Sequence, residues 1–193
     1  MGITFTDLGS DILLIPDVVD LSVCQQIIQV ADSCKFLSPP PGSSLTGELR
    51  SNEVLPLDNR NPLLESTSQL LLTPFNRVRQ ALGDRYKVRF SHIELFSLER
   101  YKPGQSHKRH MDGLVLSNRY EELAQGIPAR DVSVIGFLNE GCEGGELLFD
   151  RQAVKVKPPI GGIVAFPARY THPYQILPVL RGCQYIVVAW MFH

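Results

Sequence analysis

The chain has 193 residues, a length that fits one domain rather than two. Hydrophobic residues make up 44% of it and charged residues 20%, as in an ordinary globular protein. The formal net charge of -1 argues against broad electrostatic capture of nucleic acid or of an anionic membrane.

The sequence also carries few signs of export or membrane insertion. No stretch approaches the run of about 18 apolar residues that a transmembrane helix needs, and the N-terminus lacks the basic start and long apolar run of a secretory signal. The four cysteines contain no C-x-x-C pair and do not suggest a disulfide framework. We therefore expect a cytoplasmic protein that binds neither nucleic acid nor membranes.

Two helical patterns dominate the N-terminal part, about residues 1–84. Apolar side chains recur at helical spacing over residues 21–31, behind Asp20 as a candidate N-cap. A second pattern covers residues 62–82, where we expect Gly83 to close the helix and Pro74 to kink or divide it. The segment between the two patterns, residues 39–61, has no clear period, and we interpret it as a loop near a site or as an edge strand.

The sequence after Asp84 is typical of an all-β region. Short runs rich in Val, Ile, Phe and Tyr alternate with Gly, Pro, Asn and Asp. Residues 117–130 interrupt this pattern and are most simply a loop or a short helix over an opening. The runs are numerous enough for two facing antiparallel sheets buttressed by the helices; the predicted strands are residues 87–100, 131–138, 146–149, 154–156, 162–166 and 184–192.

Three residues of the β region form a candidate metal site. His110 and Asp112 are two positions apart, so on a strand they would point to the same face and could reach one metal together. His172, from a distant strand, would complete the set. Two imidazoles and one carboxylate leave three coordination positions open, as in non-haem Fe(II) oxygenases.

Other motifs surround these three residues in a fixed order. They are Arg100-Tyr101-Lys102-Pro103-Gly104, Phe137-Leu138-Asn139, Gly144-Gly145-Glu146, Pro158 to Phe166, and Pro178-Val179-Leu180-Arg181-Gly182-Cys183-Gln184-Tyr185. This ordered series resembles the prolyl 4-hydroxylase-like branch of the Fe(II)- and 2-oxoglutarate-dependent oxygenases, over residues 90–192.

The resemblance implies a fold and a set of cofactors. The fold is mainly β with flanking helices: a double-stranded β-helix, or jelly roll, over about residues 85–193, in a single domain of residues 1–193. The cofactors are Fe(II), with 2-oxoglutarate and dioxygen as co-substrates and ascorbate as an optional addition. The resemblance assigns His110, Asp112 and His172 to the iron, and it places the Tyr101 hydroxyl near the co-substrate, although a role for Tyr101 in core packing explains it as well.

The resemblance also implies an activity, hydroxylation of a prolyl or related side chain in a peptide or protein. Two alternatives stay open. One is a hydroxylase of a free amino acid or another small molecule, because the compact chain shows no separate peptide-binding module. The other is a non-catalytic metal-binding or interaction domain with the same fold.

The chain departs from the family pattern at the co-substrate site. Gln184 stands where the family has the basic residue that binds the distal carboxylate of 2-oxoglutarate, and Phe137 replaces a frequent tyrosine. Arg181 is the alternative source of charge if a β-bulge turns it inward. In addition, the stretch from His172 to Pro178 is two residues longer than usual in the family. An alignment that counts residues from His172 therefore differs from one that starts from the motif at Pro178.

Overall fold

A computed structural model of the chain describes residues 2–38, 50–57, 61–94, 97–113, 124 and 129–193. The helices are α1 (Leu21–Asp32) and α2 (Pro62–Tyr86). The strands are β1 (Thr6–Asp7), β2 (Leu13–Ile15), β3 (Glu53–Pro56), β4 (His92–Ile93), β5 (Ser97–Tyr101), β6 (His107–His110), β7 (Val132–Phe137), β8 (Glu143–Gly144), β9 (Leu147–Phe149), β10 (Val154–Val156), β11 (Ile163–Pro167), β12 (Tyr174–Ile176), β13 (Val179–Arg181) and β14 (Gln184–Phe192).

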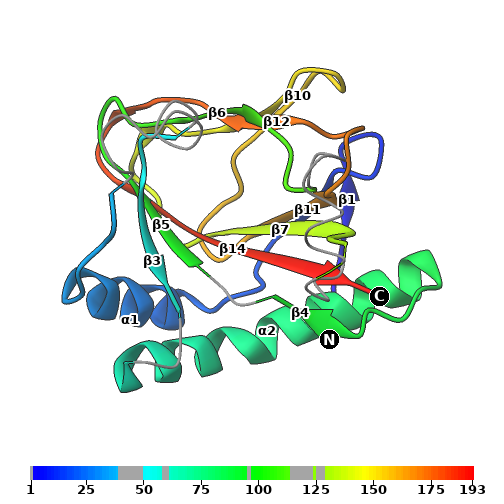
Figure 1. The fold of residues 1–193 in the computed structure, drawn as a ribbon, viewed down its shortest axis with the longest axis horizontal. Coiled ribbons are helices and arrows are strands. Elements are labelled where there is room, and N and C mark those ends of the chain that lie inside the picture. The colour runs from blue at the N-terminus through cyan, green and yellow to red at the C-terminus, as the bar shows by residue number, and fades with distance from the viewer. Residues whose placement is uncertain (1, 39–49, 58–60, 95–96, 114–123, 125–128) are drawn as a thin grey trace.

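Two antiparallel sheets form the body of the molecule. The larger sheet has eight strands in the order β1-β2-β11-β7-β14-β5-β3, with β4 also paired to β14. The smaller sheet has four strands in the order β10-β9-β12-β6, and β13 pairs with β8. Figure 1 shows both helices along one face of the large sheet and the small sheet across its other face. The predicted mainly β fold with buttressing helices is therefore confirmed.

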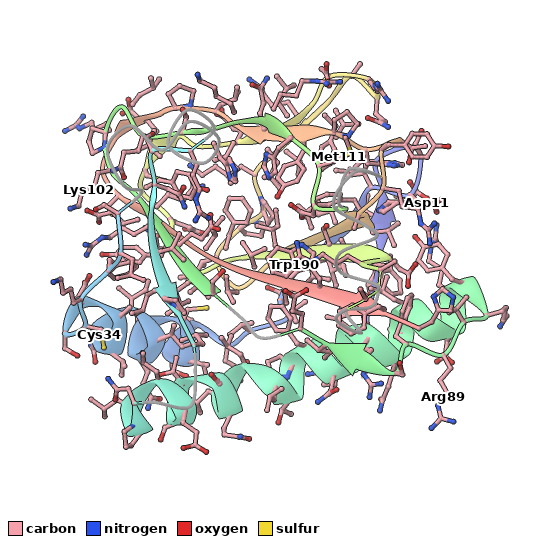
Figure 2. The ribbon with its side chains drawn as sticks, viewed as in Figure 1. Asp11, Cys34, Arg89, Lys102, Met111 and Trp190 are labelled. Carbon is pink, nitrogen blue, oxygen red and sulfur yellow. The ribbon has the colours of Figure 1, made fainter. Side chains whose placement is uncertain are left out.

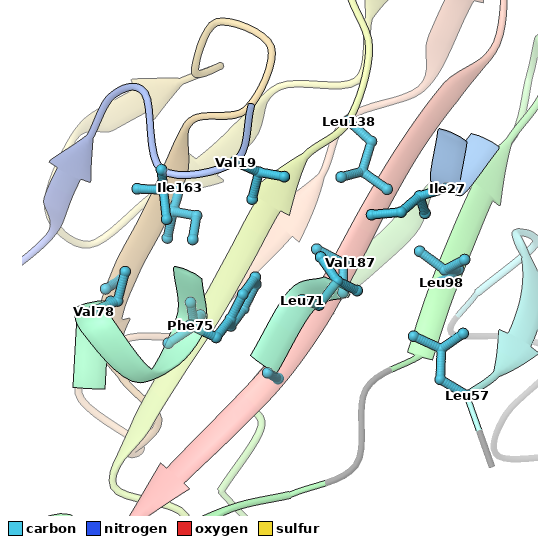
Figure 3. Packing of buried hydrophobic residues seen from close by; sticks show 14 of the residues in the cluster. Val19, Ile27, Leu57, Leu71, Phe75, Val78, Leu98, Leu138, Ile163 and Val187 are labelled. Atoms are coloured by element: carbon cyan, nitrogen blue, oxygen red, sulfur yellow. The ribbon is translucent and has the colours of Figure 1, made fainter. Parts of the chain in front are cut away.

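The apolar core has two layers because strand side chains alternate. In β14, Val187, Ala189 and Met191 belong to the layer between the large sheet and the helices, whereas Ile186 and Val188 belong to the layer between the two sheets. Figure 3 shows the first layer, where Leu71 and Phe75 of α2 lie against β14 and its neighbours. The second layer surrounds the candidate site.

The second helix is longer than its sequence predicts. Pro74 lies inside one helix and does not divide it, and Gly83 does not end it. The helix continues to Tyr86 and stops at Lys87, whose left-handed backbone (φ 57°) lets its N–H donate to the carbonyl of Gly83. Gly83 serves another purpose: a Cβ there would lie 2.8 Å from the Val88 carbonyl oxygen, so only glycine allows this close approach. Among the described residues, neither helix is long and apolar enough to cross a bilayer.

Five of the six predicted strands are present in the structure. The strands expected at residues 131–138, 146–149, 154–156, 162–166 and 184–192 correspond to β7, β9, β10, β11 and β14. The single strand expected at 87–100 is wrong, because it begins in the cap of α2 and contains the separate strands β4 and β5. For the segment 39–61, expected to be a loop near a site or an edge strand, residues 39–49 and 58–60 lie outside the described residues, and residues 53–56 form β3 at the edge of the large sheet. The loop expected at 117–130 lies mostly outside the described residues.

Candidate metal centre

The site begins with an irregularity in the pairing of β6 with β12. Tyr174 lies opposite His110 and Ile176 lies opposite His107, so three steps along β6 match two steps along β12. Such a bulge changes which face the side chains point to. As a result the rings of His107 and His110 stack, with centroids 3.7 Å apart and planes 13° apart.

The structure brings His110 and Asp112 together. Nε2 of His110 lies 3.4 Å from Oδ1 of Asp112. Nδ1 of His110 donates to the Lys108 carbonyl at 2.8 Å, which leaves Nε2 to face the carboxylate. A histidine that is oriented through its other nitrogen by a backbone carbonyl is the usual arrangement of a metal ligand. Because Asp112 lies in a bend after β6, the bend rather than strand alternation brings the pair together.

Asp112 is buried and held from several directions. The hydroxyl of Ser133 in β7 donates to Oδ2 at 2.6 Å. The hydroxyl of Tyr174 lies 3.1 Å from Oδ1 and 3.3 Å from Oδ2. The guanidinium of Arg130 donates to the backbone carbonyl of Asp112 at 3.1 Å. The carboxylate is therefore fixed in position by side chains from both sheets.

These contacts determine the charges at the site. Burial alone would raise the pKa of Asp112, but hydrogen bonds from His110 and Ser133 and the charge of His110 lower it to about 2. Burial would lower the pKa of His110, but its contact with Asp112 raises that pKa above the ordinary value. Burial and the neighbouring His110 lower the pKa of His107 to about 3. At neutral pH the site thus combines a carboxylate with a neutral His107.

An aromatic and cationic group lies beside the pair. The guanidinium of Arg130 stacks on the Trp190 ring, 3.7 Å from its centroid, and forms an ion pair with Glu94 at 2.7 Å. Figure 2 shows Trp190 in the region between the two sheets. Nε1 of Trp190 is buried. Its N–H faces the carboxylate of Asp112 and contributes to the lowered pKa of that group.

His172 lies in a turn before β12 and makes different contacts. Its Nε2 is 2.6 Å from the Ser10 carbonyl oxygen, and its Nδ1 is 2.9 Å from the Thr171 hydroxyl. Because a carbonyl can only accept, Nε2 carries the proton and Nδ1 accepts from Thr171. Both nitrogens are therefore engaged away from Asp112. The prediction that His172 binds iron stays a prediction.

The predicted co-substrate residues occupy different environments. Tyr101 is fully buried and donates to Glu99 at 2.6 Å, and burial together with the charge of Glu99 raises its pKa well above the usual value. Gln184, opposite Tyr101, is buried and donates to the Gly145 carbonyl at 2.9 Å. A Cβ on Gly145 would lie 2.2 Å from Oε1 of Gln184, so this glycine is needed for the amide to fit. Arg181 points to solvent, with 83% of its side chain exposed.

Sequence reasoning missed several residues of the site. Ser133 in β7 and Glu99 in β5 carry no motif, and their strands are recognisable only by their apolar neighbours. Arg50 lies outside the strands and is joined to His107 by an isolated bridge, and its charge acts on Glu99. The sequence does indicate Tyr174: it follows His172 by two positions, and the spacing between His172 and Pro178 is two residues longer than in the family.

The residues present fit a metal ion in part. Two ligands, each roughly 2.0 to 2.2 Å from a common ion, can be as close together as His110 and Asp112 are. No group of three His, Cys, Asp or Glu side chains within the described ranges could hold a metal ion. Tyr174 contacts both members of the pair, with its hydroxyl 3.1 Å from Oδ1 of Asp112 and its ring centroid 4.4 Å from that of His110.

The family comparison agrees with the residue pattern. The model of the 2OG-Fe(II) oxygenase superfamily matches residues 96–192, which is half of the chain. A PKHD-type hydroxylase of Synechococcus sp. (strain JA-2-3B'a(2-13)) is 26% identical over 188 residues, covering 93% of this chain and 77% of the relative. Prolyl 3-hydroxylase 2 of Rattus norvegicus is 30% identical over 93 residues, covering 44% of this chain but 13% of that larger protein.

Solved structures show the same fold. The viral collagen prolyl hydroxylase of Paramecium bursaria Chlorella virus-1 superposes with a TM-score of 0.68 at 20% identity, covering 95% of this chain and 96% of that one. A prolyl-4-hydroxylase of Pseudomonas putida gives a TM-score of 0.67 at 18% identity, with coverage of 95% and 92%. A prolyl hydroxylase of Trichoplax adhaerens, in complex with a hypoxia inducible factor peptide, gives 0.65 at 18% identity, with coverage of 95% and 84%.

Proposed function

Because the chain belongs to the 2OG-Fe(II) oxygenase superfamily, we propose that it is an Fe(II)- and 2-oxoglutarate-dependent hydroxylase of a prolyl or related side chain in a peptide or protein. The observation that carries this proposal is the fixed pair of His110 and Asp112 between the two sheets. The substrate class is supported by the hydroxylases among its relatives, including one whose structure holds a peptide. The four cysteines, all within the described ranges, are free, which supports a reducing, cytoplasmic location.

Each part of the site has a role in this proposal. When bound, iron together with 2-oxoglutarate and dioxygen supplies the oxidising power that places one oxygen atom on a C–H bond. His110 and Asp112 would hold the metal, and Ser133 would keep the carboxylate oriented. Arg130 would fix the backbone of Asp112 and the indole of Trp190 together.

The guanidinium of Arg50 is the positive charge that we propose for binding the distal carboxylate of 2-oxoglutarate. Its backbone bridges to His107, and in the extended segment it lies on the same side as Asn52, which is buried and donates to Glu99. Nε of Arg50 is buried without a hydrogen-bond partner. A buried guanidinium nitrogen without a hydrogen-bond partner favours an anionic ligand. These contacts support Arg50 as the partner of the distal carboxylate, whereas Arg181 is exposed and the amide of Gln184 is already engaged.

The non-catalytic alternative has an observation in its favour. At the position where the family has a basic residue, Gln184 is bonded within the protein. A domain with this change could bind a metal or a partner without turnover.

Turnover assays separate these functions. Purified chain is supplied with Fe(II), ascorbate, 2-oxoglutarate, dioxygen and proline-containing peptides, and succinate and peptide mass are measured. The proposal expects succinate together with a gain of one oxygen on the peptide. Succinate with oxygen gained only by a free amino acid would favour the small-molecule hydroxylase. Iron binding without succinate would favour the non-catalytic domain.

A further inference from the structure

Two residues compete for the place of the third metal ligand. His172 is the family-type residue, and Tyr174 follows it by two positions. The stretch up to Pro178 is two residues longer than the family spacing, so Tyr174 stands where the later motif would place the histidine. The sequence alone allows either alignment. The inference below rests on the proposed function insofar as it assumes a metal at this site.

Tyr174 faces the other two ligands directly. It begins β12 and lies opposite His110 in β6, with ring centroids 4.4 Å apart. Its hydroxyl oxygen lies 3.1 and 3.3 Å from the two carboxylate oxygens of Asp112. The side chain is buried, and it packs against Phe149 and Phe166, with centroids 5.8 and 4.9 Å away. These aromatic contacts fix the direction of the phenol toward Asp112.

His172 has a different structural role. Its imidazole donates to the carbonyl of Ser10 at 2.6 Å, in a turn where Ser10 and Asp11 both have positive φ, 53° and 63°. Non-glycine residues rarely adopt that conformation, so the turn needs support from elsewhere. The hydrogen bond from His172 provides such support across 162 positions of sequence. To bind a metal through Nε2, this imidazole would have to give up both the proton and the bond.

We propose that the phenolic oxygen of Tyr174, and not His172, is the third protein ligand beside His110 and Asp112. On metal binding the phenol O–H bond breaks, its proton goes to solvent, and the oxygen forms a bond to the ion in place of its hydrogen bonds to Asp112. Metal ions promote this loss of a proton from a ligand, as they do for bound water and thiols. The resulting set of one nitrogen and two anionic oxygens differs from the two nitrogens and one oxygen of the family.

The expected signature is optical. A phenolate bound to Fe(III) gives a visible charge-transfer absorption, which imidazole and carboxylate ligands do not. The whole chain is loaded with Fe(II) under nitrogen and its affinity for iron is measured; the sample is then oxidised to Fe(III) and its visible and resonance Raman spectra are recorded. The wild-type chain is expected to bind iron and to show the visible band with phenolate vibrations.

Three variants assign the ligand. Tyr174→Phe keeps the aromatic packing and is expected to abolish the band and to weaken iron binding by at least the roughly 10- to 100-fold that loss of an outer-shell partner costs. Tyr174→His is expected to restore binding without the band. His172→Gln keeps an N–H donor for Ser10 and is expected to keep both the band and the affinity.

The opposite pattern overturns the inference. If His172→Gln loses iron while Tyr174→Phe retains it, His172 is the ligand and the proposed function stands with the family's usual set. If the wild-type chain binds iron and produces succinate but shows no phenolate band, the inference fails and the proposed function survives. If the wild-type chain binds no iron, both fail.

Discussion

The two faces of the eight-stranded sheet are built from the same strands but differ in chemistry. Toward the helices, β7 and β14 present apolar side chains such as Val134 and Val187, packed against Phe75. Toward the small sheet, the alternate positions of β7 present Phe137 and then Ser133, which donates to Asp112. One face is therefore a continuous apolar layer, and the other mixes apolar side chains with buried polar ones.

The difference shows how the site keeps its geometry. Buried polar groups are costly unless each is hydrogen-bonded, and on the inner face Asn52 donates to Glu99 and Gln184 donates to Gly145. These hydrogen bonds join residues from different segments, so they form only if neighbouring strands keep their register. The apolar layer on the helix side holds those strands in register, so stability and site geometry are divided between the two faces.

The largest effect is expected from a cavity on the helix side. Phe75 is fully buried in α2, and Phe75→Ala should lower the free energy of unfolding by about 3 to 5 kcal/mol through lost burial and the void left behind. Urea denaturation measures it. Leu63→Ala on the same helix is the control, because Leu63 is 56% exposed, and should cost less than about 0.5 kcal/mol. Equal losses in the two variants would mean that the two faces of α2 are not distinct.

The opposite pattern is expected on the inner face. Asp112→Asn keeps the shape of the side chain but removes the charge that the metal needs, so turnover should fall by more than about 100-fold. Thermal unfolding should change much less than in Phe75→Ala. Succinate formation and circular dichroism measure the two quantities, and turnover at the wild-type level would show that the carboxylate is not a ligand.

A smaller effect is expected for the co-substrate. Removing a charge-assisted hydrogen bond costs about 1.5 to 3 kcal/mol, so Arg50→Ala should raise the 2-oxoglutarate concentration needed for half-maximal turnover by roughly 10- to 100-fold. Arg181→Ala is the matched control, because 83% of that side chain is exposed. Gln184→Ala should change this concentration less than Arg50→Ala, because the Gln184 amide already donates to the Gly145 carbonyl. A strong effect of Arg181→Ala with none of Arg50→Ala would reverse the assignment.

The smallest effect is expected at the sheet edge. Burial alone would raise the pKa of Glu53, but hydrogen bonds from Lys102 at 2.9 Å and Arg100 at 2.7 Å lower it below its usual 4.5. A carboxyl group whose pKa is lower in the folded state stabilises that state at pH values above its pKa in the unfolded chain. This contribution is lost as the pH falls through the pKa of the folded state. Glu53→Gln should therefore lower the free energy of unfolding at pH 7 by about 1 kcal/mol or less. Below pH 4.5 the free energy of unfolding should decrease less in this variant than in the wild-type chain. Urea midpoints between neutral and acidic pH test this, and parallel curves would contradict it.

The sequence could predict elements that carry a long pattern. The helix over 21–31 and the strands β7 and β14 have enough apolar positions to define a period. Strands β1 and β2 have two and three residues, too few for any period. Strand β6 reads His-Lys-Arg-His, a polar run that resembles a loop, and only pairing with β12 makes it a strand. Pairing between distant segments is not encoded in local periodicity.

The site was predictable to a similar extent. The motif placed His110 and Asp112 near one another, and the structure brings their side chains within 3.4 Å. The sequence shows two additional residues before Pro178, but counting them cannot show whether His172 or Tyr174 takes the position of the family's histidine. In the structure, His172 is held away from that position by its hydrogen bond to Ser10, a residue far away in the sequence. The orientation of Arg50 likewise depends on a bridge to His107.

The bulge in β6 also restricts how this gene can change. His107 and His110 share a face only because three steps along β6 match two steps along β12. Loss of one codon for Lys108 or Arg109 would leave two steps on each strand, so regular pairing would still place both imidazoles on one face. Loss of both codons would make the two histidines neighbours that point to opposite faces. In a deletion scan of the gene, substitutions at these two exposed positions and loss of one of them should therefore be tolerated, whereas loss of both should not.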